Sequence, residues 1–405
     1  MKAGWQTKTL GEVCQIKPPK SEARDRLAAD GLVSFLPMEN MGIGEKFVRA
    51  TQAKPLSAVV GSYTYFADGD VLLAKITPCF ENGKLGIAEG LTNGIGFGSS
   101  EYIVFRPNKT LSKEWLYYYL SRETFRVEGA ARMSGAVGHK RVSKEFIESY
   151  PIPVPPLPEQ QRIVDILDEA FDGIATAKAN AAKNLQNARA LFESHLQSVF
   201  TQRGEGWVEK RLGDVAESMS TGPFGTMLHK SDYVSDGIPL VNPMNIVESK
   251  IVPSSKMMVN EETRDRLSSY VLKTRDIVIG RRGELGRCAL VTEREAGWLC
   301  GTGSFFVRLK NLMDGKFFVA FFGSEQFKAR LEANSVGTTM SSLNHGILNE
   351  LLIPVPPIKV QRVIMERVNK LLSETQRLES LYQQKLTALD ALKKSLLHQA
   401  FNGQL

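Results

Sequence analysis

Three short stretches of the sequence contain residue types that occur in catalytic or cofactor-binding sites. Gly94-Ile95-Gly96-Phe97-Gly98 has the spacing of a cofactor glycine loop. A dinucleotide or methyl-donor site needs a strand before such a loop and a helix after it. Here residues 99–101 lead directly into residues 102–105, which have the aromatic and β-branched composition of a strand. We therefore interpret the glycine stretch as a hairpin loop.

The other two stretches contain polar residues of the kinds that DNA-modifying enzymes use. Asn242-Pro243-Met244-Asn245 is similar to the Asn-Pro motif of amino-methyltransferases, but its counterpart Leu36-Pro37-Met38-Glu39 shares only Pro-Met. Glu248-Ser249-Lys250 has the residue types of half a nuclease carboxylate–lysine motif, and the first half of the chain has no equivalent. We interpret both Pro-Met stretches as structural turns and expect no nuclease centre.

The histidines and cysteines are not spaced as metal ligands or as a disulfide framework. They are His139, His195, His229, His345, His398, Cys14, Cys79, Cys288 and Cys300. The sequence also lacks a phosphate loop of the Gly-x4-Gly-Lys type. Because no catalytic constellation is complete, we expect a non-catalytic protein with no metal and no cofactor of its own.

Basic and polar side chains on glycine-bearing loops remain as candidates for binding. They recur at matching places in the two halves of the chain, but with different side chains. The candidates are Lys75, Thr77, Asn82, Lys84, His139, Lys140, Arg141, Arg281, Arg282, Arg287, Thr338, Thr339, Ser341, Ser342 and Asn344. Such groups can reach DNA phosphates or the acceptor edge of guanine, although solvated loop charge is the alternative. Two copies of one scaffold with different contact residues would read two different targets.

The recurrence reflects an internal duplication. The offset is 201 residues around the proline clusters, 202 near the start of each half and 206 in between. The matched pairs include Pro155 with Pro356, Ser194 with Ser395, Phe200 with Phe401, Leu10-Gly11 with Leu212-Gly213, and Asp70-Val71 with Asp276-Ile277.

Each proline cluster precedes one long segment with an apolar stripe at steps of three and four residues, which predicts a helix. Pro158 is well placed as the first helical residue. About 40 residues per helix correspond to roughly 60 Å at 1.5 Å per residue. A helix of that length with one narrow apolar stripe needs a partner, and the other copy is the simplest one.

The segments before the helices predict mixed domains. Residues 71–73, 102–105, 277–279 and 305–309 are expected to form strands, and residues 114–120 and 316–322 helices. The expected fold class is α+β. Two duplicated mixed α/β domains are separated by two long helices that form an antiparallel coiled coil with pseudo-two-fold symmetry. The expected boundaries are 1–152 for the first domain, 153–201 for the first helix with its proline-rich lead-in, 202–353 for the second domain and 354–405 for the second helix.

Composition limits the class of protein. The chain has 405 residues, enough for more than one domain, and its net charge of +7 suits a polyanionic partner such as DNA. The sequence contains no run of eighteen apolar residues, and its first residues lack the apolar core of a signal peptide. We therefore expect a cytoplasmic protein that does not enter a membrane.

The lead-in to the first helix carries a family resemblance. Residues Ile152-Pro153-Val154-Pro155-Pro156-Leu157-Pro158-Glu159-Gln160-Gln161-Arg162-Ile163 resemble the proline–glutamine signature of specificity subunits of Type I restriction–modification systems. Ala400-Phe401-Asn402-Gly403-Gln404-Leu405 is similar to the usual finish of their second helix. Asp70–Leu73 and Asp276–Ile279 resemble a strand of their target-recognition domains. The second signature, 356–362, is one residue shorter and lacks the glutamate.

The resemblance implies a function and partners. Each target-recognition domain would read one half of a bipartite sequence in double-stranded DNA, and the helical pair would set the spacer. Two modification subunits, which carry S-adenosylmethionine and methylate adenine, would dock on the helices. Restriction subunits that use ATP would join them in defence against phage. Two alternatives remain open at this point: a self-contained DNA methyltransferase or nuclease, and a coiled-coil scaffold that binds no DNA.

Overall fold

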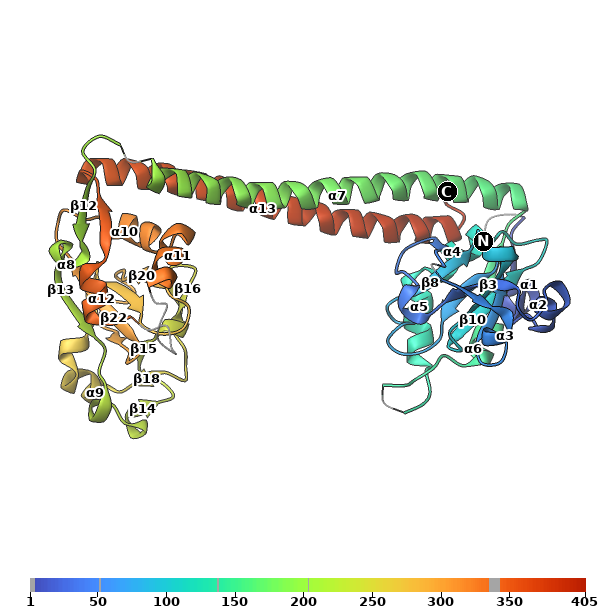
Figure 1. Ribbon diagram of the computed structural model, residues 1–405, viewed down its shortest axis with the longest axis horizontal. Coiled ribbons are helices and arrows are strands. Elements are labelled where there is room, and N and C mark those ends of the chain that lie inside the picture. Colours follow the sequence, from blue (N-terminus) through green and yellow to red (C-terminus); the bar gives the residue numbers. More distant parts are fainter. Residues whose placement is uncertain (1–3, 51, 137, 203, 335–342) are drawn as a thin grey trace. The chain divides into compact units, whose positions relative to one another are not determined.

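The chain divides into two compact units, each made of one domain and one half of each long helix. The computed structural model describes residues 4–50, 52–136, 138–202, 204–334 and 343–405 (Figure 1). The first unit contains residues 1–182 and 383–405, and the second contains residues 183–382.

The domain of the first unit contains a five-stranded sheet, a four-stranded sheet and short helices. Strand β3 (Leu32–Leu36) pairs in parallel with β9 (Ile95–Gly98), and β4 (Phe47–Val48) pairs in parallel with β8 (Leu85–Ala88). The other strand pairs of these two sheets are antiparallel. The five-stranded sheet has the order β2 (Cys14–Ile16), β10 (Tyr102–Pro107), β7 (Val71–Ala74), β8 (Leu85–Ala88) and β4 (Phe47–Val48). The other sheet has the order β5 (Gln52–Pro55), β3 (Leu32–Leu36), β9 (Ile95–Gly98) and β6 (Thr64–Ala67). The helices are α1 (Leu10–Val13), α2 (Ser21–Arg26), α3 (Leu56–Val59), α4 (Lys113–Leu120), α5 (Glu123–Ala131) and α6 (Lys144–Ser149).

The domain of the second unit repeats this plan. One sheet has the order β13 (Ala216–Thr221), β22 (Ser304–Leu309), β19 (Ile277–Gly280) and β20 (Cys288–Leu290). Another has the order β14 (Tyr233–Val234), β18 (Met258–Val259), β15 (Ile238–Val241) and β21 (Leu299–Cys300), and β16 (Ile246–Val247) pairs with β17 (Lys250–Ile251). The helices are α8 (Leu212–Val215), α9 (Glu261–Arg266), α10 (Gly315–Phe322), α11 (Glu325–Asn334) and α12 (His345–Glu350). The predicted mixed α/β duplication is confirmed.

We had interpreted the glycine stretch as a hairpin loop, and this interpretation is wrong. Residues Ile95–Gly98 form the buried strand β9, which pairs with both β3 and β6. A Cβ atom on Gly96 would collide with the ring of Phe66, and one on Gly98 would collide with the carbonyl oxygen of Leu36. The glycines therefore allow close packing inside a sheet and do not cradle a cofactor.

An aspartate–arginine pair ties the central strands together in both domains. Asp70 is 1% exposed, and both its carboxylate oxygens accept hydrogen bonds of 2.8 Å from Arg106 on β10. The equivalent Asp276 accepts bonds of 3.1 and 3.4 Å from Arg308 on β22. Burial raises the pKa of Asp70, and the arginine offsets that effect by favouring the charged form. The Asp-apolar motif before each strand thus has a structural role.

The proline-rich lead-ins are short extended strands. β11 (Pro151–Val154) pairs with β1 (Gln6–Thr9), and β23 (Leu352–Val355) pairs with β12 (Val208–Arg211). A two-stranded ribbon tolerates proline because the missing amide can face outward. Each ribbon delivers the chain to the start of a long helix.

The two long helices begin at equivalent residues. α7 spans Leu157–Thr201, so Pro158 is its second residue, and α13 spans Ile358–Phe401. We had expected the second signature to be one residue shorter than the first, but the two have the same length. Gln361 lies 201 residues after Gln160, and Val360 simply replaces Glu159.

A buried glutamine holds the start of each helix against its domain. Gln160 is 0% exposed; its Oε1 accepts a 2.8 Å bond from the Ser112 amide, and its Nε2 donates to the carbonyls of Thr110 and Pro155. Gln361 makes the same three bonds, accepting from the Asp314 amide and donating to the carbonyls of Leu312 and Pro356.

The helices α7 and α13 pack together in antiparallel order. In the first unit Lys178 on α7 pairs with Asp390 on α13 at 2.6 Å, and in the second unit Arg189 pairs with Glu379 at 2.6 Å. The far end of each helix enters the domain that precedes the other helix. Phe401 packs on Trp115 with ring centroids 4.5 Å apart, and Phe200 packs on Phe317 at 5.5 Å.

Removing the buried glutamine should destabilise the first unit. Gln160→Ala removes the partner of one amide and of two carbonyls, which costs about 1–3 kcal/mol for each group that stays buried and unsatisfied. We expect a lower denaturation midpoint for Gln160→Ala in urea unfolding. Gln161→Ala is the matched control, since Gln161 bonds only Asp165 on the exposed face among the described contacts. Equal midpoints for both variants would contradict the assigned role.

Candidate nucleic-acid interface

The structure brings together the two loop clusters of the first domain that the sequence singled out. The loop after β7 lies against the segment before α6. Ile76 bridges to Arg141, the Thr77 amide donates to the Lys140 carbonyl at 3.0 Å, and the Val142 amide donates to the Lys75 carbonyl at 3.0 Å. Lys75, Thr77, Lys140 and Arg141 therefore form one surface, named here the first loop site.

A carboxylate that the sequence reasoning missed organises the first loop site. Glu101 accepts two hydrogen bonds from Arg141, from Nε at 2.9 Å and from Nη2 at 2.7 Å. Lys75 Nζ lies 3.9 Å from Glu101 and donates to the Ser100 carbonyl at 3.0 Å. The Arg141 guanidinium holds the pKa of Glu101 below its usual value, and Lys75 adds to that effect. The cations of this site are thus partly neutralised from within.

The first-domain candidates as a whole lie in different surroundings, and only Lys75, Thr77, Lys140 and Arg141 share the first loop site. His139 and Lys140 are exposed, whereas Lys84 Nζ is held by the Met38 carbonyl at 2.7 Å. The Thr77 hydroxyl donates to the Lys140 carbonyl at 3.3 Å and also contacts Glu81. Asn82 lines a separate cavity beside the long helices. The structure therefore leaves Lys84 and Asn82 outside the first loop site.

The second domain uses the same backbone frame with different side chains. The Arg281 amide donates to the Gly303 carbonyl at 2.8 Å, as the Lys75 amide donates to the Glu101 carbonyl at 2.9 Å. Gly303 therefore stands where the first domain has Glu101. Arg281 lies over the Phe305 ring at 5.9 Å, and its Nε is buried without a hydrogen-bond partner among the described residues.

A second unpartnered polar atom lies next to Arg281. Ser304 is 0% exposed, and its hydroxyl also has no partner in the described part of the chain. Ser304 faces Gly280 in the β19–β22 ladder, one residue before Arg281. We name Arg281 and Ser304 the second loop site. Unlike the first loop site, it has glycine at the Glu101 position, so no carboxylate at that position neutralises the guanidinium of Arg281.

The remaining second-domain candidates are divided between exposed, paired and capping positions. Arg282 is exposed, and Arg287 is paired with Glu284 at 2.7 Å and with the Pro243 carbonyl at 3.3 Å. The Asn344 side chain accepts from the Ile347 amide at 2.9 Å and thereby caps α12. Thr338, Thr339, Ser341 and Ser342 lie outside the described residues.

The two enzyme-like stretches of the second domain are turns. Pro243–Asn245 form a single 3-10 turn in which Asn245 Oδ1 accepts from the Asn242 amide at 3.0 Å. Glu248 and Ser249 have positive φ values of 48° and 59° in the tight turn between β16 and β17. Within the described ranges, no group of three histidine, cysteine or acidic side chains is arranged to hold a metal.

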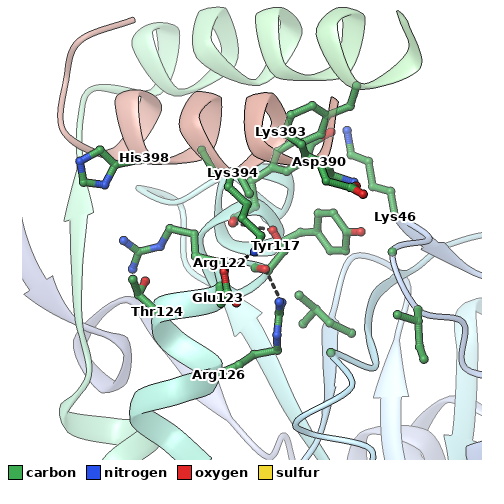
Figure 2. A pocket seen from close by; sticks show the side chains of 18 of the residues that line it. Lys46, Tyr117, Arg122, Glu123, Thr124, Arg126, Asp390, Lys393, Lys394 and His398 are labelled. Atoms are coloured by element: carbon green, nitrogen blue, oxygen red, sulfur yellow. Dashed lines mark hydrogen bonds and ion pairs between the residues drawn. The ribbon is translucent and has the colours of Figure 1, made fainter. Parts of the chain in front are cut away.

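A cavity of about 610 Å³ lies between the first domain and the long helices within the first unit (Figure 2). Lys46 pairs with Asp168 of α7 at 2.6 Å, and Asp168 also accepts from the Tyr118 hydroxyl. On the α13 side, Lys394 pairs with Glu123 at 2.8 Å. Burial lowers the pKa of Lys393, whose ammonium lies 4.8 Å from the Phe171 ring centre. These contacts join helix to domain.

Comparison with known proteins decides the family. A family model described as "Type I restriction modification DNA specificity domain" matches residues 2–184 and again residues 204–388. This chain belongs to that family. The two matches cover both halves, and they confirm the duplication that the 201-residue offset predicts.

Individual members of the specificity-domain family are moderately similar to this chain in sequence. The specificity subunit of Type I restriction enzyme EcoAI from Escherichia coli is 38% identical over 162 residues, which are 40% of this chain and 27% of that protein. The MjaVIII specificity subunit from Methanocaldococcus jannaschii is 23% identical over 99% of this chain and 93% of its own length. This chain thus spans about a quarter of the EcoAI subunit in alignment.

A solved chain from a study of complex assembly in the type I R-M system has the same fold. It has a TM-score of 0.77 and 18% identity, covering 100% of this chain and 99% of that chain. The long helices and the paired domains are therefore features of the specificity-domain fold. No helix among the described residues is both long and apolar enough to cross a membrane.

The Glu101–Arg141 pair should give a pH-dependent contribution to stability. Because the folded pKa of Glu101 is lowered, its contribution is fully present above the ordinary carboxyl pKa of 4.5 and is lost as pH falls through the lowered value. The partly exposed pair is worth about 0.2–1 kcal/mol. Glu101→Gln should therefore melt earlier than the unsubstituted chain at pH 7, and the difference should vanish at acidic pH.

A matched carboxylate tests whether this difference is specific. Glu169 is exposed in the first third of α7, so Glu169→Gln removes one charge without removing the Glu101–Arg141 pair. Melting curves of both variants between pH 3 and pH 7 give the comparison. A pH-independent difference for Glu101→Gln would show that the ion pair is not its cause.

Proposed function

We propose that this chain is the DNA-sequence-specificity subunit of a Type I restriction–modification complex. Each domain reads one half of a bipartite target in double-stranded DNA, and α7 with α13 sets the length of the unspecified spacer. The chain itself is non-catalytic. The family membership supports this proposal, and so does the net charge of +7, which favours binding to a polyanion.

The observation that carries the proposal is the difference between the two loop sites. The same strand ends and the same backbone bonds hold Lys75 in one domain and Arg281 in the other. In the first domain Glu101 pairs with Arg141 and lies near Lys75, whereas the second domain has Gly303 at that place, and Arg281 Nε has no acceptor among the residues that the structure describes. A guanidinium prefers the O6 and N7 atoms of guanine, and carboxylates accept from the cytosine amino group. Two domains so equipped recognise different half-sequences.

The partners follow from the same proposal. Two modification subunits, which carry S-adenosylmethionine and methylate adenine, dock against the long helices, and restriction subunits that use ATP complete the assembly. The complex acts in the cytoplasm as a defence against phage. The domain boundaries at 152, 201 and 353 and the fifteen loop residues singled out from the sequence are part of this proposal.

The direct test is methylation mapping in cells that express this chain with its modification subunit. We expect one bipartite sequence motif, methylated in both halves and absent when this chain is omitted. Methylation of DNA by the purified chain alone with S-adenosylmethionine would overturn the non-catalytic assignment.

Substituting the guanidinium of the second loop site should weaken one half of the target. Arg281→Ala should lower affinity for specific DNA about tenfold or more, because one bidentate base contact contributes about 1–3 kcal/mol of discrimination. Arg281→Lys keeps the charge but loses the planar fork, so it should relax a single base position while retaining much of the non-specific binding.

An arginine elsewhere on the same domain is the control for this experiment. Arg264 is half-buried on α9 and pairs with its neighbour Asp265 at 2.9 Å. Arg264→Ala should leave the sequence motif unchanged. Titration of the complex with duplexes carrying single base changes measures both effects, and melting curves exclude loss of fold. An unaltered motif in both Arg281 variants would remove this residue from the reading surface.

Lengthening the helices should lengthen the spacer. One added helical turn in both α7 and α13 adds about 5.4 Å, which is roughly one or two base pairs at 3.4 Å each. Methylation mapping should then show the same two half-sequences with a longer gap. A gap of unchanged length would refute the idea that the helices act as a ruler.

A further inference from the structure

The ion pairs between the long helices follow a sign rule. In the first unit Lys178 Nζ on α7 lies 2.6 Å from Asp390 Oδ1 on α13. In the second unit Arg189 Nε on α7 lies 2.6 Å from Glu379 Oε1 on α13. In both pairs the cation belongs to α7 and the anion belongs to α13.

The internal duplication makes these two pairs counterparts of each other. Residue 178 plus 201 is 379, and residue 189 plus 201 is 390, so the four residues occupy only two kinds of position. If the helices were true copies, the first position would carry one charge sign on both helices. Instead the charge sign is opposite at both positions, because the basic Lys178 corresponds to the acidic Glu379 and the basic Arg189 corresponds to the acidic Asp390.

This arrangement disfavours pairing between identical helices. In an antiparallel pair of two α7 helices in the same register, Lys178 of each would face Arg189 of the other. In a pair of two α13 helices, Glu379 of each would face Asp390 of the other. A pair of two α7 helices or of two α13 helices therefore has two repulsions where the pair of α7 with α13 has two attractions. Charges of the same sign at such distances destabilise a helix pair.

The two helices also differ in the size of the side chains with which they pack on each other. Ala181 and Ala188 of α7 are 1% and 8% exposed, so α13 packs closely over them. The counterparts 201 residues later are the large residues Tyr382 and Leu389. At these two positions a pair of α7 helices would hold less side-chain volume than the pair of α7 with α13, and a pair of α13 helices would hold more. Underpacking and overpacking both lower stability.

We propose that the two long helices are built as unlike partners, so that α7 accepts α13 and rejects a second α7. Two copies of this chain then do not exchange halves, although the duplication gives each helix nearly the same length. This pairing rule stands on the helices alone. Given the proposed DNA reading, its effect is that every particle contains one domain of each kind and therefore one asymmetric target.

Charge exchange in the full-length chain tests the rule without removing any ion pair inside the chain. The double variant Lys178→Glu with Asp390→Lys keeps an attractive pair between α7 and α13. It also places opposite charges at positions 178 and 189 of α7 and at positions 379 and 390 of α13, so like helices now attract. Net charge stays the same.

The quadruple variant is the matched control. Adding Arg189→Glu and Glu379→Lys to the double variant reverses both pairs, so α7 becomes uniformly acidic and α13 uniformly basic at these positions. Every pair within the chain is again attractive, and like helices again repel. The quadruple variant and the unsubstituted chain should therefore behave alike.

The measurement is the mass distribution of the three chains by light scattering at equal concentration and low salt. Because an exchanged dimer contains four altered contacts, we expect the dimer association constant of the double variant to be at least tenfold higher than that of the other two chains. Added salt should reduce the difference. Equal mass distributions for all three chains, whether monomeric or dimeric, would overturn the proposal. Melting curves establish that all three are folded.

Discussion

The buried carboxamide at the start of each long helix is the constraint on which the rest of the structure depends. Gln160 and Gln361 each bond one amide and two carbonyls, and in both cases the partners belong to the loop before a domain helix and to the proline lead-in. The three bonds fix the direction in which the helix leaves the domain. The antiparallel packing of α7 and α13 requires that direction to be correct for both helices. A planar side chain with an acceptor and two donors suits this task, since both its oxygen and its nitrogen find partners although the side chain is fully buried.

Around this common frame the duplicated domains keep their scaffold and change their surface. The aspartate–arginine pairs at Asp70 and Asp276 join equivalent strands, and they position the ends of β7 and β19 alike. Beyond those strand ends the residues diverge, with Glu101 in one domain and Gly303 in the other. A rigid support with variable loop residues is the arrangement expected of a recognition module, because affinity and specificity then change without loss of the core.

The sequence predicted the parts of this structure that depend on local pattern or on repetition. The apolar stripe gave both long helices, and the constant offset gave the duplication and the equivalent strands. The prediction from sequence failed where the local structure depends on residues that are distant along the chain. Gly96 looked like a loop residue because nothing local shows that Phe66 lies against it in a sheet. Glu101 was missed because its partner Arg141 is forty residues away, and only the folded domain brings them together. The cavity beside Asp168 was missed for the same reason, although Asp168, Phe171 and Asp172 share one helix face.

The insertion of each helix end into the domain of the other half has a consequence for synthesis on the ribosome. Phe401, Leu397 and Ala400 belong to the same apolar cluster as Trp115 and Tyr119 of the first domain. The second domain instead draws on Phe200, made before it, and on Met365 and Val368, made shortly after. The domain translated first is therefore the one that completes its interior last. Until the final turns of α13 emerge from the ribosome, Trp115 and Tyr119 of the nascent first domain lack the ring of Phe401 that packs on them in the folded chain.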